Sequence, residues 1–277
     1  MYLGRKRVKF LCFLGFIGLL LFHSSLKFFF SPTAEDPCEI LEKETPKIKN
    51  SSLPKVIHKP WKDNGPLPER IDRWFQTWRK VFPNHEIIIW TDDKAKELIE
   101  NEFPWFLPSY NALKKSIMKI DSVRPFVLYK YGGLFVDMDY EVLEDFWDRL
   151  PDDMPAFVQS YWVGYEDLQN SFMSSPPNHP FWKYTWQVME ERIATGSQDE
   201  IWVTACTMIS AAIELYPGPV KILPCQNWQR LSIGEQTIKH RLWRKFANMM
   251  GLFRECGNVD DTRCELVIHR SMTSWNP

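Results

Sequence analysis

The sequence lacks an excess of charge of either sign. It has 34 Lys and Arg residues against 35 Asp and Glu residues, which leaves a formal net charge of −1 over 277 residues. Proteins that bind nucleic acid through its phosphates usually carry a net basic surface. We therefore expect no nucleic-acid partner.

Glycine is scarce, with 12 residues, and no glycine-rich phosphate-binding loop is present. The Gly-x-Gly-x-x-Gly pattern of dinucleotide-binding folds is missing, and so is the Walker loop of ATP-binding proteins. The sequence therefore excludes the ordinary dinucleotide and ATP sites.

Cysteine is also sparse, and its spacing matches no zinc site. One of the six lies in the N-terminal apolar segment; the others are Cys38, Cys206, Cys225, Cys256 and Cys264. In an oxidising compartment, five cysteines favour two disulfides and one remaining thiol. The economical pairings are Cys256 with Cys264 and Cys206 with Cys225, and Cys38 could then link two chains into a homodimer.

One long apolar segment is present, at the N-terminus. Basic residues at positions 5–9 precede an uninterrupted apolar run at 10–22, and counting through Phe30 gives 21 residues, enough to cross a bilayer. A cleaved signal peptide is the alternative, but no small-residue cleavage site follows cleanly. Because the basic residues should stay in the cytosol, we predict a single-pass type II membrane protein of the Golgi or a related endomembrane.

This topology divides the chain into four parts. We expect a cytoplasmic tail at 1–9, a transmembrane signal-anchor at 10–30, a lumenal stem at 31–53 and one folded domain at 54–277. The stem contains the N-glycosylation sequon Asn50-Ser51-Ser52, which is usable only in the lumen.

From residue 54, short apolar strands alternate with amphipathic helices. This pattern predicts an α/β domain with a parallel sheet and helices on both faces. Strands are expected at 54–58, 87–90, 134–136 and 220–223, the last at a sheet edge. Helices are expected at 68–81, from 94 with a cap at 91–93, at 112–131 with a kink or a fresh start at Pro125, and at 182–193 and 201–215.

Two carboxylates follow the third of these strands. Asp137 and Asp139 are one residue apart, so a continuing strand would point both to one side and Met138 to the other. Two oxygen ligands at a strand end suit Mg²⁺ or Mn²⁺, which in turn can hold a diphosphate. The alternative is a solvated turn after a buried strand.

Other candidate residues lie near the ends of neighbouring elements. His58 and Trp61 fall just past the first strand, where open α/β sheets bind ligands, although ordinary packing is the alternative. Asp121 and Arg124 are three residues apart and share a helix face. They are either a surface ion pair or contacts to the ribose and phosphate of a nucleotide.

Several ordered motifs together resemble the DXD-containing family of Golgi-type glycosyltransferases, which includes initiating α-1,6-mannosyltransferases and inositol phosphoceramide mannosyltransferases. Two positions depart from the family pattern: Lys59 stands where the family has Gln, and Phe135 where it has Tyr. The matching stretches are 54–61, Trp90-Thr91-Asp92, Asp121 with Arg124, 132–139, Asn170 with 174–175 and 179–180, His269, and Ser274-Trp275.

The resemblance implies a GT-A-type, Rossmann-like mixed sheet, a nucleotide-sugar donor, a divalent cation (Mn²⁺ or Mg²⁺) and retention at the anomeric carbon. It makes Asp137 and Asp139 the catalytic residues and metal ligands, with Asp137 either sharing the metal or holding the ribose. His269 is the candidate third ligand, and the alternative is a packed or surface histidine. The residues that it places at the nucleotide sugar are His58, Trp61, Asp121, Arg124, Gly133, Asn170, Ser274 and Trp275.

On this basis we expect a retaining transferase that moves a hexose, foremost mannose from GDP-mannose, to a glycolipid such as inositol phosphoceramide or to a glycan. Segment 236–253 has a basic face opposite an apolar one, which favours either a membrane interface or packing on the domain's own core. The alternatives are a UDP-sugar-dependent galactosyl- or glucosyltransferase, an Asp-x-Asp phosphohydrolase, and a non-catalytic partner with the same fold.

Overall fold

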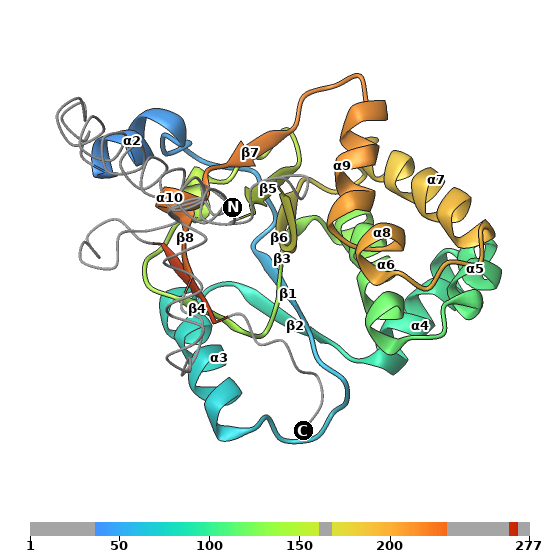
Figure 1. Cartoon of the computed structure of the whole chain (residues 1–277). Helices are drawn as coiled ribbons and strands as arrows, with labels where there is room; N and C mark the ends of the chain where they lie inside the picture. Colours follow the sequence, from blue (N-terminus) through green and yellow to red (C-terminus); the bar gives the residue numbers. More distant parts are fainter. Residues whose placement is uncertain (1–36, 161–167, 232–265, 271–277) are drawn as a thin grey trace, which may run out of the picture.

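A six-stranded sheet forms the centre of the molecule, with the strand order β2-β1-β3-β6-β5-β7 (Figure 1). The structure is a computed structural model that describes residues 37–160, 168–231 and 266–270. All strands of this sheet run in one direction except β6, which is antiparallel to both neighbours. The strands are β1 (Val56–Pro60), β2 (Glu86–Trp90), β3 (Gly133–Val136), β5 (Ala156–Gln159), β6 (Leu168–Ser175) and β7 (Lys221–Leu223).

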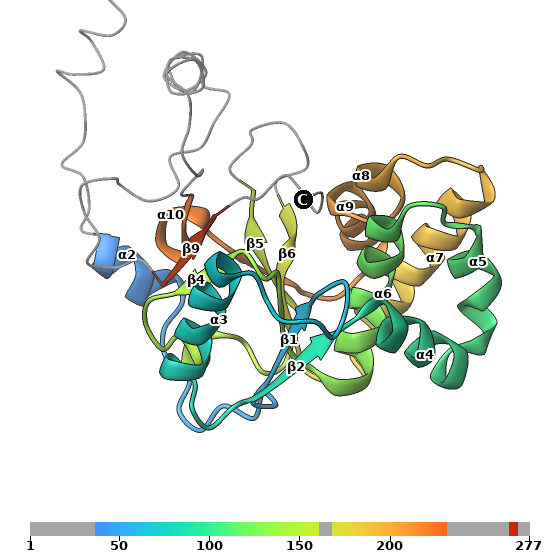
Figure 2. The ribbon, with the colours of Figure 1, turned by 90° about the horizontal axis from the view of Figure 1, so that it is seen from below.

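Helices cover both faces of this sheet, as the sequence predicts (Figure 2). One face carries α4 (Asp92–Glu102), α5 (Leu107–Ala112), α6 (Ser116–Tyr131), α7 (Phe181–Ala194), α8 (Glu200–Val203) and α9 (Cys206–Leu215). The other face carries α3 (Glu69–Val81), α10 (Cys225–Trp228) and α2 (Pro37–Glu44). Two short 3₁₀ turns, η1 (Pro104–Phe106) and η2 (Trp147–Arg149), lie in the connections. The mixed α/β class is confirmed.

The apolar run in β3 shows how the two faces are filled. Leu134 and Val136 pack with Trp78 of α3, whereas Phe135 between them packs into the cluster under α4 to α9. A strand buried on both faces needs apolar residues throughout rather than an alternating pattern. The sequence signal of β3 is therefore a short continuous apolar run.

Local sequence signals predict the start of α4 and the position of β7 correctly. The Thr91 hydroxyl accepts a hydrogen bond from the Lys94 backbone N–H at 3.3 Å and caps α4 as predicted. Helix α6 runs through Pro125 without a break, which excludes a fresh helix start there and leaves the alternative, a kink, as a prediction. The strand at 220–223 is β7, which lies at the edge of the sheet as expected.

A second, three-stranded sheet was not predicted. It has the order β4-β9-β8, formed by β4 (Tyr140–Val142), β8 (Gln229–Leu231) and β9 (Val267–His269). Tyr140 pairs with His269 across the antiparallel β4 and β9. This pairing places His269 next to the residues that follow β3.

The expected stem is partly folded onto the domain. Leu41 and Leu53 are 5% and 2% exposed and join the cluster on the α3 face. Arg149 Nη1 donates to the Thr45 carbonyl at 3.0 Å, and its Nη2 pairs with Glu42. Residues 37–53 therefore differ from the tether that their proline and charge content predicts, because apolar residues in them find a place in the core.

The predicted pairing of Cys206 with Cys225 is wrong. Cys206 is a free thiol in α9, whereas Cys225, at the start of α10, is disulfide-bonded. The two helices lie on opposite faces of the central sheet (Figure 1), so short sequence separation does not bring the thiols together. Cys256 and Cys264 lie outside the described residues, and so does the side chain of Cys38.

Two membrane predictions concern residues outside the described part of the chain, namely segments 10–30 and 236–253. Among the described residues, no helix combines the length and hydropathy needed to cross a bilayer.

Gly133 has a structural role that predicts the effect of a substitution. Its φ is +83°, and a Cβ at this position would meet the Val56 carbonyl oxygen at 2.3 Å. We expect Gly133→Ala to lower the free energy of unfolding by about 3 kcal/mol, because strain and a backbone clash add. Denaturant titration of the purified full-length chain measures this change.

Gly196→Ala is the matched control for this experiment. Gly196 has a similar φ of +78°, but apart from its chain neighbours no atom of the described residues lies within 4 Å of its added Cβ. Only backbone strain is introduced, so we expect a loss of about 1 kcal/mol. Equal losses for the two variants would show that the close approach of β1 to β3 is not what requires Gly133.

Candidate active site

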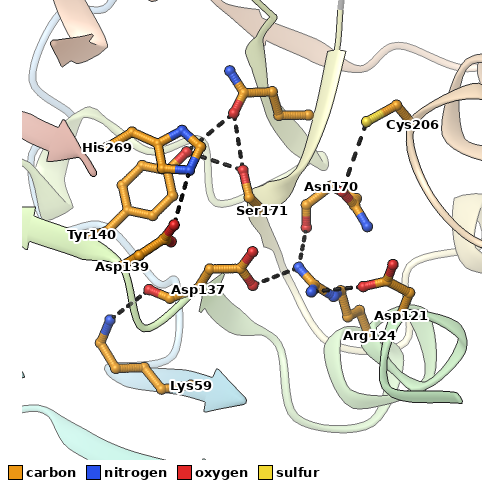
Figure 3. A network of polar contacts seen from close by, with 11 residues as sticks. Lys59, Asp121, Arg124, Asp137, Asp139, Tyr140, Asn170, Ser171, Cys206 and His269 are labelled. Atoms are coloured by element: carbon orange, nitrogen blue, oxygen red, sulfur yellow. Dashed lines mark hydrogen bonds and ion pairs between the residues drawn. The ribbon is translucent and has the colours of Figure 1, made fainter. Parts of the chain in front are cut away.

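The Asp137-Met138-Asp139 segment is a turn that leads from β3 to β4. The Tyr140 backbone N–H donates to the Asp137 carbonyl at 3.4 Å, which closes the turn. The period-two expectation is therefore wrong, because it holds only in a continuing strand. The Asp137 carboxylate points to Arg124 and the Asp139 carboxylate to His269 (Figure 3).

Asp137 is held by a buried arginine. Arg124 Nη1 lies 2.7 Å from Asp137 Oδ1, and Arg124 Nη2 lies 2.7 Å from Asp121 Oδ1. The Arg124 side chain is 3% exposed, and its Nη1 also donates to the Asn170 carbonyl at 2.8 Å. The surface ion pair considered from the sequence is excluded: this is a buried ion triad, whose arginine cannot be removed without stranding two carboxylates.

Burial sets the protonation behaviour of these acids. It raises the pKa of Asp137 to about 6, with Asp139 and Asp121 adding to the rise and Arg124 opposing it. Burial also raises the pKa of Asp121, while Arg124 and a hydrogen bond from Asn170 oppose that rise. The Asp137 side chain keeps 20% of its exposure, so a ligand can reach it despite the arginine.

Asp139 faces the histidine that the second sheet delivers. His269 Nε2 lies 3.5 Å from Asp139 Oδ2, and the Arg270 backbone N–H donates to the Asp139 carbonyl at 2.9 Å. The His269 ring stacks on Tyr140 with centroids 4.3 Å apart and planes 8° apart. The Tyr140 hydroxyl shares a 3.0 Å hydrogen bond with Ser171 Oγ. The His269 ring is therefore fixed in orientation by β4 and β6.

A buried lysine lies beneath the turn. Lys59 is fully buried, and its Nζ donates to the Asp137 carbonyl at 3.1 Å and lies 4.1 Å from the centre of the Trp78 ring. Burial lowers the pKa of Lys59 to about 7, and Asp137 and Asp139 oppose this shift. The only sequence signal for this residue was its departure from the family motif.

Two residues predicted to contact the nucleotide sugar, His58 and Gly133, have structural roles instead. His58 is fully buried; its Nε2 lies 2.9 Å from the Gly132 carbonyl, and its Nδ1 accepts from Trp90 Nε1 at 3.0 Å. Gly133 is tightly packed against β1 at the start of β3, the end away from Asp137. Both residues hold the sheet, because the motif that contains them also builds the core.

The other residues predicted to contact the nucleotide sugar lie in different surroundings. Trp61 is half-buried, and its ring packs against the cluster that contains Met138, next to the turn. The Asn170 side chain bonds Asp121 and also accepts a 3.8 Å contact from Cys206 Sγ. Asp121 is 5% exposed behind Arg124. Ser274 and Trp275 lie outside the described residues.

Four residues at the site were not predicted from the sequence: Tyr140, Ser171, Lys59 and Cys206. Tyr140 directly follows the Asp-x-Asp pair, and Ser171 follows Asn170, so proximity to the motifs was the available signal. Nothing local indicates that Cys206 lies beside Asn170, since α9 reaches β6 only in the folded chain.

The residues of the turn fit a divalent cation in part. Within the described part of the chain, no three His, Cys, Asp or Glu side chains already form a metal cage. Asp139 and His269 nevertheless face each other, and the buried His269 Nδ1 has no hydrogen-bond partner among the residues that the structure describes. One carboxylate and one imidazole suit a cation such as Mn²⁺, whose remaining positions a substrate's phosphates can fill.

Comparisons with known proteins agree with the motifs. Residues 68–157 match the family model described as "Glycosyltransferase sugar-binding region containing DXD motif". The chain is similar to inositol phosphoceramide mannosyltransferase 3 of Schizosaccharomyces pombe, 32% identical over 136 residues, which cover 48% of this chain and 36% of that protein. It is also similar to mannosyl phosphorylinositol ceramide synthase SUR1 of Saccharomyces cerevisiae, 34% identical over 48% of this chain and 34% of that one.

These matches have limited extent. The matched region spans 36%, 45% and 34% of the length of the first three curated relatives. Among solved structures, a glycosyltransferase titled PaToxG superposes with a TM-score of 0.49 and 15% identity, covering 77% of this chain and 84% of that one.

The buried His58 predicts a dependence of stability on pH. Burial lowers the pKa of His58 from 6.5 to about 4, so the folded protein keeps the ring neutral where the unfolded chain protonates it. Its contribution to the free energy of unfolding is fully present above pH 6.5 and is lost as the pH falls to about 4. The loss should reach about 3 kcal/mol.

His58→Gln isolates this contribution, because its amide can donate to the Gly132 carbonyl but does not titrate. Denaturant titrations of both proteins between about pH 4 and pH 7 measure the difference. We expect the wild-type protein to lose more stability than the variant as the pH falls. Parallel curves would contradict the assignment of a neutral, buried His58.

Proposed function

We propose that the chain is a metal-dependent, retaining mannosyltransferase of GT-A type, because residues 68–157 match the model of the glycosyltransferase family with a DXD sugar-binding region. Its donor is GDP-mannose and its acceptor is a glycolipid of the inositol phosphoceramide kind. The relatives named above carry this activity in their names, which supports the sugar and the acceptor class.

One observation carries the proposal. The turn at residues 137–139, called the motif turn below, and β9 are far apart in the sequence, yet His269 Nε2 lies 3.5 Å from Asp139 Oδ2. Asp139 and His269 would hold Mn²⁺ or Mg²⁺. A bound cation of this kind neutralises the charge that develops on the two phosphates as the bond to the sugar breaks. The protein then needs few other charged groups at the leaving group.

Asp137 has a different task from Asp139 in this proposal. Arg124 holds its carboxylate away from His269, with 20% of the side chain still exposed. In that position the carboxylate can accept hydrogen bonds from the ribose or the sugar. Trp61, half-buried beside the turn, offers an aromatic surface on which the base can stack.

No side chain is assigned as general base. In a retaining transfer the departing phosphate oxygen can itself take the proton of the acceptor hydroxyl. The chain's task is then to orient the donor through Asp137 and Trp61 and to exclude water. Phosphohydrolase chemistry would need Asp137 as the nucleophile, and its ion pair with Arg124 opposes that role.

A membrane-embedded acceptor agrees with the predicted topology. We propose that segment 10–30 anchors the chain in a Golgi-type membrane with the domain in the lumen. The exposed Asn50 of the sequon would then be open to glycosylation.

A donor screen tests the proposal. The purified full-length chain is incubated with GDP-mannose, UDP-galactose or UDP-glucose, Mn²⁺ and inositol phosphoceramide, and the release of GDP or UDP is followed together with lipid product. We expect GDP release and a mannosylated lipid, both abolished by a chelator. Release of UDP alone would refute the mannose assignment and leave the family unaffected.

Asp139→Asn should lower kcat at least about 100-fold, because a neutral amide binds the cation poorly. Asp93→Asn is the control, since Asp93 is an exposed carboxylate in the first turn of α4 and should leave the rate unchanged. An active Asp139→Asn protein would contradict the assigned metal ligand.

A further inference from the structure

Lys59 is an unusual residue to find in the middle of a sheet. It lies in β1, which is paired with strands on both sides, and it is fully buried. Lysine is almost never fully buried unless its charge is paired. Its burial therefore points to a role that needs the charge.

The contacts of Lys59 place that charge directly under the motif turn. Its Nζ donates to the Asp137 carbonyl at 3.1 Å, and Trp78, whose ring lies under the ammonium, donates from Nε1 to the Tyr140 carbonyl at 2.7 Å. Lys59 and Trp78 thus hold the carbonyls at the two ends of the turn. Figure 3 shows the lysine approaching the turn from the side opposite Arg124.

The hydrogen bond to the Asp137 carbonyl does not by itself require lysine, because the amide of a glutamine at position 59 could donate to the same oxygen. What lysine adds is a positive charge close to Asp137 and Asp139, both of which interact with it electrostatically. In a poorly solvated site such a charge acts over several ångströms.

We propose that Lys59 is a positioning residue whose charge tunes the candidate active site: it weakens the binding of a divalent cation to the turn and strengthens the binding of a nucleoside diphosphate. The inference rests on the proposed function, because it assumes that both ligands bind beside Asp139. A cation is repelled by the ammonium and a diphosphate is attracted, so the two affinities should respond with opposite signs when the charge is removed.

Direct binding measurements on the full-length chain test this inference without reference to turnover. Mn²⁺ affinity is measured from the EPR signal of free Mn²⁺ without nucleotide, and GDP affinity by calorimetry at saturating Mn²⁺, both in slightly acidic buffer. For Lys59→Met we expect Mn²⁺ to bind about 10-fold more tightly and GDP about 10-fold more weakly.

The opposite signs distinguish an electrostatic role from a structural one. If Lys59 only supports the turn, replacing it should weaken the binding of both Mn²⁺ and GDP. That result, or unchanged affinities for both ligands, overturns the inference. Lys59→Gln removes the charge and keeps a hydrogen-bond donor, so it should give the same pair of shifts. It decides between the two roles if Lys59→Met does not fold.

Lys55→Met is the matched control, since Lys55 is exposed on the same segment and should change neither affinity. Wild-type protein that binds neither Mn²⁺ nor GDP would refute the proposed function itself. Wild-type protein that binds both, with variant affinities that move in the same direction, would refute only the role of Lys59.

Discussion

The ion triad around Arg124 is the constraint on which the site depends. One guanidinium joins three elements, since it pairs with Asp121 in α6 and Asp137 after β3 and donates to the Asn170 carbonyl in β6. A buried arginine with two carboxylates is stable only as a complete set, because removing one member strands the charge of the others. The triad therefore fixes where β3 ends and how the motif turn begins.

The turn then separates the two carboxylates of the motif. Asp137 is committed to Arg124, whereas Asp139 faces His269, which β9 carries to it and which Tyr140 holds by stacking. Two acids with similar sequence surroundings thus acquire different tasks. Lys59 lies beneath them and donates a hydrogen bond to the Asp137 carbonyl. The site therefore contains several buried charged groups in addition to the two candidate metal ligands, Asp139 and His269.

Sequence reasoning recovered the parts of the fold that local signals determine. The strands β1, β2 and β3 and the capped start of α4 follow from apolar runs and a Thr91 cap. The antiparallel direction of β6 and the small sheet with β9 depend on pairing between distant segments, which periodicity does not record. His58 illustrates the same limit, because a histidine in a motif can serve the core or the ligand, and only its contacts decide.

We propose that Asp139 and His269 together hold the cation that binds the donor's diphosphate. Anomalous scattering from Mn²⁺ in crystals of the protein with GDP tests this proposal. We expect a single manganese peak within about 2.3 Å of an Asp139 carboxylate oxygen and a His269 nitrogen, with both phosphates completing its coordination. A peak bound by Asp137 without His269, or one away from the turn, would contradict it.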